Sequence, residues 1–242
     1  MPNLIEHSAN TNSIENCYHE LVNRLRSAEV RFGRTPGSVR LVAVSKTRSP
    51  EVIRTIAALG QTDFGENQLQ EALGKIEILS DLDCIWHFIG SIQTNKCRNI
   101  AANFDWVHSV DRLKIARRLS DLRPTTAAPL NIFLQVNLQE EATKSGIASG
   151  EELTSLASAT RNLPNLQLRG LMAIPVPESN FDRQRKVFRR LRELQNGLNQ
   201  TLDLSLDCLS IGMTDDLEAA VAEGATHVRV GTAIFGPRNR QT

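Results

Sequence analysis

Hydrophobic and polar positions alternate along the chain in two ways, one typical of amphipathic helices and one typical of buried strands. The first pattern is helical and runs from about Ser13 to Phe32, with apolar residues three or four apart and Ser13 as the N-cap. A turn at Gly33 and 35–37 ends this helix. The polar residues 1–12 carry no such stripe, and we expect them to form a flexible N-terminal segment.

Beyond this helix, short runs rich in Val, Leu and Ile predict eight strands, and helical patterns separate them. The predicted strands lie near 39–45, 61–64, 84–89, 104–108, 130–137, 166–172, 207–211 and 226–231. The predicted helices lie near 49–59, 66–79, 93–102, 111–121, 150–161, 181–199 and 214–223. This alternation over 242 residues has no linker-like break, so it predicts one domain, 1–242, folded as a parallel (β/α)₈ barrel with an extra N-terminal helix.

Composition narrows the classes of function. Hydrophobic residues make up 40% of the chain, enough for a sizeable core, and charged residues make up 23% with a net charge of +1. This balance gives no bulk attraction to nucleic acid or membranes, so neither is expected as a partner. The N-terminus lacks the apolar segment of a signal peptide, and no stretch is long enough to span a bilayer. We therefore expect a cytoplasmic protein.

The cysteines and histidines do not indicate a disulfide framework or a metal site. Cys17, Cys84, Cys97 and Cys208 form no C-x-x-C pair, as expected for reduced, mostly structural thiols. The five histidines lack the spacing of metal ligands. We therefore expect no metal.

Lys46 lies at the end of the first predicted strand, 39–45. Active groups in such barrels lie at the carboxyl ends of the strands. Burial there would disfavour the ammonium form, and a neutral amine can attack an aldehyde carbonyl. The alternative is a lysine that extends past the edge of the sheet into water.

The ends of the last two strands carry glycines and hydroxyls that suit a phosphate group. Barrels often bind phosphate with the loops after strands seven and eight, where glycines let backbone N–H groups approach the oxygens. In the alternative interpretation, Gly212 and Gly231 only form tight turns and Thr214 caps a helix. From the residues alone, the candidate phosphate ligands are the backbone of Gly212 and Gly231 and the hydroxyls of Ser210 and Thr232.

Arg229 lies two residues before Gly231 in an otherwise apolar strand, so alternation places both on the same face. A guanidinium that points into a barrel needs an acceptor. A lysine on strand one, an inward arginine and a phosphate cup match the needs of pyridoxal 5′-phosphate (PLP), namely a Schiff-base lysine, a partner for the ring nitrogen and a phosphate site. An arginine partner would keep that nitrogen unprotonated and weaken the ring as an electron sink.

The chain resembles the YggS/PROSC family of PLP-binding proteins, often called PLP homeostasis proteins. The matching stretches follow the family's order and lie at 43–47, 64–67, 86–90, 144–146, 170–172, 210–216 and 228–236. The resemblance implies a barrel like the N-terminal domain of alanine racemase, with Lys46 as the Schiff-base lysine and Arg229 facing the ring nitrogen. It also places Asn67 and Met172 near the ring, and it implies a phosphate cup formed by Ser210, Gly212, Met213, Gly231 and Thr232, with Thr214 as a further candidate. The implied role is PLP homeostasis that affects amino-acid and keto-acid balance, without established catalysis.

Three positions add detail to the resemblance. Ser91 stands where the family commonly has His, which removes an imidazole near the rim of the site. Thr214 stands where Ser is common, and it keeps the hydroxyl. Lys144 matches a lysine that the resemblance offers as a secondary PLP contact, and the alternative is an ordinary loop lysine.

Two other classes of function stay open. A fold-type III PLP enzyme, an amino-acid racemase or a lyase, needs a second acid or base opposite Lys46, and the chain's one tyrosine, Tyr18, lies on the first helix. A binding module for anions or nucleic acid could use the basic residues at 183–192, although their spacing favours a solvated helix face. We expect a monomer that binds PLP as its ligand, and the sequence does not identify recipient enzymes or regulators.

Overall fold

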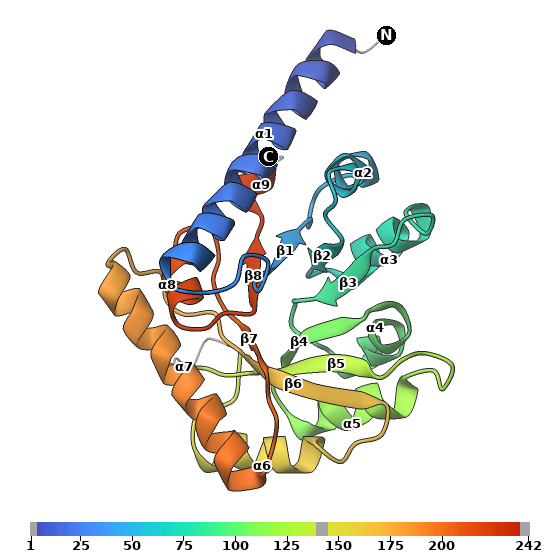
Figure 1. Ribbon diagram of the computed structural model, residues 1–242. Helices are drawn as coiled ribbons and strands as arrows, with labels where there is room; N and C mark the ends of the chain where they lie inside the picture. The colour runs from blue at the N-terminus through green and yellow to red at the C-terminus, as the bar shows by residue number, and fades with distance from the viewer. Residues whose placement is uncertain (1–3, 139–144, 238–242) are drawn as a thin grey trace.

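Eight parallel strands close into a barrel in chain order, β1 to β8, in the computed structural model, which describes residues 4–138 and 145–237 (Figure 1). The strands are β1 (Arg40–Val44), β2 (Asp63–Glu66), β3 (Ile85–Phe88), β4 (Trp106–Val110), β5 (Leu130–Gln135), β6 (Leu166–Met172), β7 (Cys208–Ser210) and β8 (His227–Val230). Strand β1 pairs with both β2 and β8, which closes the sheet. The predicted parallel (β/α)₈ barrel is confirmed.

Helices surround the barrel and cover its outer face (Figure 1). They are α1 (Leu4–Arg31), α2 (Pro50–Ala58), α3 (Leu69–Ile78), the short 3₁₀ helix η1 (Thr94–Lys96), α4 (Cys97–Asn103), α5 (Leu113–Leu122), α6 (Glu151–Thr160), α7 (Phe181–Leu202), α8 (Leu217–Ala222) and α9 (Thr232–Phe235). The N-terminal helix α1 packs against α2, α8 and α9. The extra N-terminal helix is therefore part of the wall around the barrel.

The start of the first helix and the presence of a last short helix differ most from the sequence prediction. The helix α1 begins at Leu4, so the predicted N-cap at Ser13 is wrong, and Ser13 lies inside the helix. That 1–12 form a flexible segment stays a prediction. The four-residue helix α9 was not predicted, because a single turn is too short to show a helical period.

The strands divide the apolar residues between two cores. Outward-facing residues such as Leu41 and Phe64 pack in the large cluster between the barrel and its helices. A separate apolar cluster lies inside the barrel, and its members are Trp106, Phe133, Met172 and Cys208. Side chains from alternate strands fill the interior of such barrels, and ligands bind at the carboxyl ends of the strands. No helix in the described part of the chain has the length and apolar character to cross a membrane.

Candidate functional site

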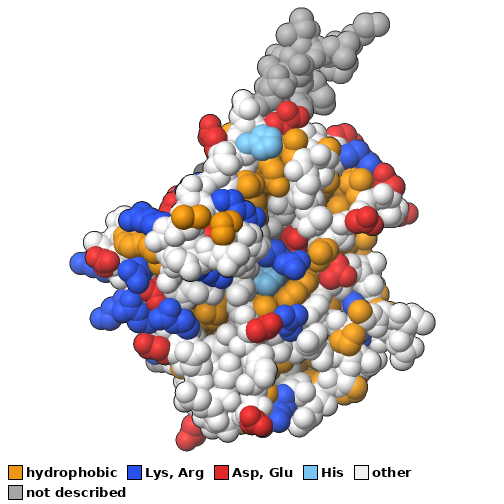
Figure 2. All heavy atoms as spheres, in the orientation of Figure 1, with side chains coloured by type: hydrophobic (Ala, Val, Ile, Leu, Met, Phe, Trp, Pro, Cys, Tyr) orange, Lys and Arg blue, Asp and Glu red, His pale blue; other side chains and the backbone are white. Residues whose placement is uncertain are grey.

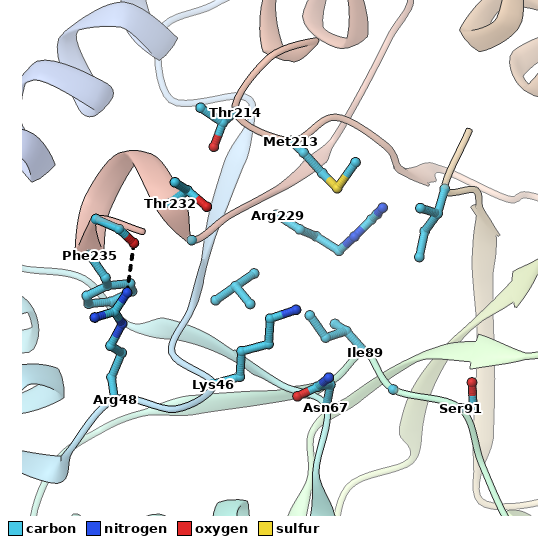
Figure 3. A pocket seen from close by; sticks show the side chains of 15 residues that line it. Lys46, Arg48, Asn67, Ile89, Ser91, Met213, Thr214, Arg229, Thr232 and Phe235 are labelled. Carbon is cyan, nitrogen blue, oxygen red and sulfur yellow. Dashed lines mark hydrogen bonds between the residues drawn. The ribbon is translucent and has the colours of Figure 1, made fainter. Parts of the chain in front are cut away.

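A cavity of about 400 Å³ opens at the carboxyl ends of the strands (Figure 3). Its walls come from segments far apart in the sequence, which follow β1, β2, β3, β6, β7 and β8. A volume of this size is typical of a site for a small molecule or cofactor. Its lining residues are Val44, Lys46, Arg48, Asn67, Ile89, Gly90, Ser91, Ile174, Met213, Thr214, Arg229, Gly231, Thr232, Phe235 and Gly236.

Lys46 extends from the end of β1 into this cavity (Figure 3). The backbone beside it is unusual, since Thr47 has φ of +63°, a conformation that a β-branched residue rarely adopts. The N–H of Thr47 donates to Glu71 Oε1 at 2.5 Å, and the N–H of Arg48 donates to the Ser45 carbonyl at 3.0 Å. These contacts hold the strained turn, which fixes the direction in which Lys46 leaves the strand.

A buried ammonium supports the same turn from below. Lys75 Nζ on α3 donates to the Ser45 carbonyl at 2.8 Å, to Glu66 Oε1 at 2.7 Å and to Glu71 Oε1 at 2.6 Å. Glu66 is fully buried, and burial raises the pKa of its carboxyl despite the neighbouring ammonium. Through Ser45 and Glu71, Lys75 holds the backbone on both sides of Lys46.

Arg229 on β8 brings a second cationic side chain to the cavity (Figure 3). It is 5% exposed, and its guanidinium donates to Ser210 Oγ at 2.5 Å and to the Ala173 carbonyl at 3.0 Å. Burial lowers the pKa of Arg229 to about 10, so the side chain stays charged at neutral pH. Both of these acceptors are neutral oxygens, so neither of them neutralises the guanidinium charge at the cavity.

Asn67 follows β2 and lines the cavity between Lys46 and the third strand (Figure 3). Its Oδ1 atom is buried and has no hydrogen-bond partner among the described residues. Gly90 is required beside it, because a Cβ there would lie 2.2 Å from the Asn67 carbonyl oxygen. A buried acceptor without a partner, on a residue that lines the cavity, is a candidate group for a bound ligand to satisfy.

The loops after β7 and β8 bring hydroxyls and glycine to one side of the cavity. Thr214 and Thr232 line it together with Gly231, where a Cβ would lie 3.1 Å from the Val44 carbonyl. Met213 lines it too, but its N–H already donates to Asp216 Oδ1 at 2.6 Å. Four of the six predicted phosphate ligands are thus brought together.

Three predicted site residues do not line the cavity. Ser210 is fully buried, and its hydroxyl contacts Arg229 and His108 beneath the cavity. Gly212 has φ of +96° and meets α8, where a Cβ would lie 2.6 Å from Ala220 Cβ, so its need for glycine is structural. Met172 is fully buried in the inner cluster. The geometry therefore shows Ser210 in contact with Arg229 beneath the cavity, and a phosphate contact from Ser210 stays a prediction.

Two further residues, Arg48 and Ser91, line the rim of the cavity. Arg48 lines the cavity but was not predicted, and its guanidinium donates to the Gly236 carbonyl at 2.7 Å and packs against Phe235. Its position two residues after Lys46 is a signal that could have suggested it. Ser91 also lines the cavity, and its hydroxyl lies 3.4 Å from that of Ser145. Lys144 lies outside the described residues.

A family model described as "Alanine racemase, N-terminal domain" matches residues 7–239. A protein of Pseudomonas aeruginosa named pyridoxal phosphate homeostasis protein is 58% identical over 216 residues, which is 89% of this chain and 92% of that protein. The chain belongs to the pyridoxal phosphate homeostasis protein family. The member from Escherichia coli K12 is 46% identical over 231 residues, which is 94% of this chain and 98% of that one.

Solved structures agree with this family and fold. PipY of Synechococcus elongatus, solved with PLP bound, is 38% identical and superposes with a TM-score of 0.78 over 87% of this chain and 98% of PipY. Alanine racemase of Corynebacterium glutamicum is 18% identical with a TM-score of 0.66, over 93% of this chain and 62% of the racemase. The latter similarity shows a shared barrel fold only.

The basic residues of α7 in this family member are largely engaged within the protein. Arg185, Arg189 and Arg192 converge on the buried Glu223 carboxylate, with N–O distances of 2.8, 2.9 and 3.1 Å. Figure 2 shows Lys and Arg side chains gathered on the side of the molecule where α7 lies. A carboxylate among three guanidinium groups explains why these arginines share one helix face, and it weakens the case for a nucleic-acid surface there.

Proposed function

We propose that this chain binds PLP and serves in PLP homeostasis, through which it affects amino-acid and keto-acid balance. The observation that carries the proposal is one cavity that holds Lys46, Arg229 and the orphaned Asn67 oxygen. The names of its relatives and the PLP-bound structure of PipY support the same ligand. The residues present fit the cofactor, which has an aldehyde for the amine, a ring nitrogen for a donor and a dianionic phosphate.

Each cofactor group has a candidate partner in this chain. We propose that Lys46 forms the Schiff base and that Arg229 donates to the ring nitrogen, which keeps that nitrogen unprotonated. Thr214, Gly231 and Thr232 would receive the phosphate, and the positive charge of Arg48 at the same rim favours an anion. A bound PLP supplies an electrophilic carbonyl and a ring that can accept electrons, and an arginine at the nitrogen restrains the second property.

The alternative function is a fold-type III PLP enzyme, an amino-acid racemase or a lyase. Two-base chemistry needs an acid or base on the face of the cofactor opposite Lys46. Tyr18 cannot supply it, because its ring is buried on α1 and its hydroxyl donates to Gln61 Oε1 at 3.4 Å. No carboxylate, imidazole, thiol or phenol is found among the described residues that line the cavity. We therefore propose a carrier of PLP without dedicated catalysis, active as a monomer in the cytoplasm.

A PLP titration tests this function. Purified protein freed of cofactor is titrated with PLP and, separately, with pyridoxal, while visible absorption and protein fluorescence report binding. The proposal expects PLP to bind with a visible band, and pyridoxal to bind far more weakly because it lacks the phosphate. Lys46→Ala should lose the band, whereas the exposed Lys114→Ala should keep it. A wild-type protein that gives no band with excess PLP would refute the proposal.

A second measurement separates the carrier from the enzyme. The PLP-loaded protein is incubated with a panel of amino acids, and racemised or cleaved products are quantified. Turnover that disappears in Lys46→Ala would favour the enzyme over the carrier, whereas the carrier predicts no turnover above the rate of free PLP.

A further inference from the structure

A continuous chain of hydrogen bonds runs through the inside of the barrel behind Arg229. The guanidinium donates to Ser210 Oγ at 2.5 Å, and Ser210 Oγ lies 2.7 Å from His108 Nδ1. His108 Nε2 lies 2.9 Å from His87 Nδ1, and His87 Nε2 lies 2.9 Å from Asp63 Oδ1. These residues come from five strands, β8, β7, β4, β3 and β2, so the chain crosses the barrel from wall to wall.

The carboxylate at the far end determines the direction of every bond. Asp63 also accepts from Arg40 Nη1 at 2.8 Å, at the amino-terminal end of β1. Burial alone would raise the pKa of Asp63, but hydrogen bonds from His87, Arg40 and Thr62 lower it to about 2. An ionised carboxylate only accepts hydrogen bonds, so His87 must donate to it from Nε2.

The remaining protons then follow by elimination. Burial lowers the pKa of His87 and holds that of His108 well below its ordinary value, so both imidazoles are neutral at pH 7. A neutral His87 that donates from Nε2 accepts at Nδ1, and His108 must therefore donate from its own Nε2. His108 then accepts at Nδ1, so the Ser210 hydroxyl donates to it and offers its lone pairs only to Arg229.

The surroundings of this chain are dry and aromatic. The four relay residues between Arg229 and Arg40 are each 5% exposed or less. His87 stacks on Trp106 with ring centroids 5.7 Å apart, and His108 packs on Phe133 at 4.6 Å. Hydrogen bonds are stronger and polarise one another in such a medium, and a missing partner there is costly. The chain therefore behaves as one unit.

We propose that Ser210, His108, His87 and Asp63 form a one-directional hydrogen-bond relay that holds the Arg229 guanidinium toward the cavity. The relay makes Ser210 an obligate acceptor, so the arginine cannot turn away or exchange its partner. These four are positioning residues that act through Arg229. The inference rests on the proposed function for its ligand, because the oriented guanidinium is the group assigned to the PLP ring nitrogen.

The first test needs no cofactor. In the full-length protein labelled with ¹⁵N-histidine, NMR should show His87 and His108 as neutral Nε2–H tautomers at pH 6, where a free imidazole is largely protonated. In a second sample labelled with ¹⁵N-arginine, the Arg229 guanidinium should show slow rotation about its C–N bonds, and Ser210→Ala or His108→Phe should make this rotation faster. An Nδ1–H tautomer or a charged imidazole at either histidine would overturn the relay, as would an Arg229 that is equally restrained in both variants.

The second test measures discrimination at the ring nitrogen. Affinity for PLP is compared with that for its 1-deaza analogue, in which a C–H group replaces the nitrogen. A hydrogen bond from a charged donor predicts that wild-type protein prefers PLP by about tenfold. Ser210→Ala and His108→Phe should each lose most of this preference, and the double variant should lose no more than either single one. Additive losses, or preferences unchanged in both variants, would contradict the relay.

His227→Leu is the matched control. This histidine lies in the same aromatic interior, 6.1 Å from the ring of His87 and 6.0 Å from that of His108, yet no hydrogen bond joins it to the relay. The His227→Leu variant should keep both the slow rotation of the Arg229 guanidinium and the preference for PLP. Melting temperatures identify any variant that fails to fold. If one fails, Asp63→Asn replaces it as a milder change at the far end of the relay. A wild-type protein that binds neither ligand would refute the proposed function, while the NMR test would still decide the relay.

Discussion

Removing the buried ammonium beneath the β1 turn gives a prediction whose size follows from the structure. In Lys75→Met, the fully buried Glu66 loses its cationic partner, and the Ser45 carbonyl loses a donor. Breaking a buried ion pair by deleting one partner costs about 3–5 kcal/mol. For a chain of this length that corresponds to a melting temperature lower by about 6–20 °C. The exposed Lys114→Met should shift stability by less than about 0.5 kcal/mol.

The dependence of this loss on pH identifies its cause. Burial raises the pKa of Glu66 in the folded protein, and loss of Lys75 should raise it further. A raised carboxyl pKa means that stability is fully present below the unfolded value of about 4.3 and is lost as pH rises through the folded value. The difference between Lys75→Met and wild type should therefore be full at pH 7.5 and should shrink toward pH 4.5.

Urea unfolding followed by circular dichroism at several pH values measures this difference. Adding Glu66→Gln to Lys75→Met should recover part of the stability at pH 7.5, because a neutral amide needs no counterion. If Lys75→Met matches wild type within about 0.5 kcal/mol, or if its deficit is the same at every pH, then the ion pair does not stabilise the turn as argued.

Three further predictions concern other parts of the barrel. Burial lowers the pKa of His87, His108 and His227 inside the barrel, so the folded protein should lose stability as pH falls below about 6.5. Melting temperatures measured across this pH range should fall less steeply in His227→Leu, whereas the exposed His19→Gln should behave as wild type. Gly212→Ala should destabilise by about 1–3 kcal/mol, because φ is +96° and the new Cβ meets α8, whereas Gly74→Ala in open space on α3 should be neutral or stabilising in the same unfolding assay. Glu223→Gln should lower the free energy of unfolding by about 2 kcal/mol and lower the melting temperature, because three arginines would then repel one another. High salt screens this repulsion, so the loss should be smaller there.

The sequence predicts the barrel well because its signals are local. Most of the eight strands contain a short apolar run, with β2 (Asp63–Glu66) an exception, and the helices between them show their own period, so order and number follow without knowledge of distant contacts. Lys46 and Arg229 were placed correctly at the cavity for a similar reason, since strand order fixes which end of a barrel they reach.

The relay and the task of Ser210 could not be predicted in this way. Alternation shows that Ser210 and Arg229 each point inward, but not that one hydroxyl lies under one guanidinium. His87 and His108 are 21 residues apart, and Ser210 lies 102 residues beyond His108. Only closure of the sheet brings these side chains together, and their spacing along the chain does not predict these contacts.

The central claim is that Lys46 holds PLP through a covalent bond. Borohydride reduction of the PLP-loaded protein would fix the cofactor on its lysine, and peptide mass spectrometry would then locate it. Because trypsin does not cleave after a modified lysine, we expect the added mass on an uncut peptide, Leu41–Arg48. The same mass on a peptide containing another lysine, such as Lys75, or a protein left unmodified after reduction, would contradict the account.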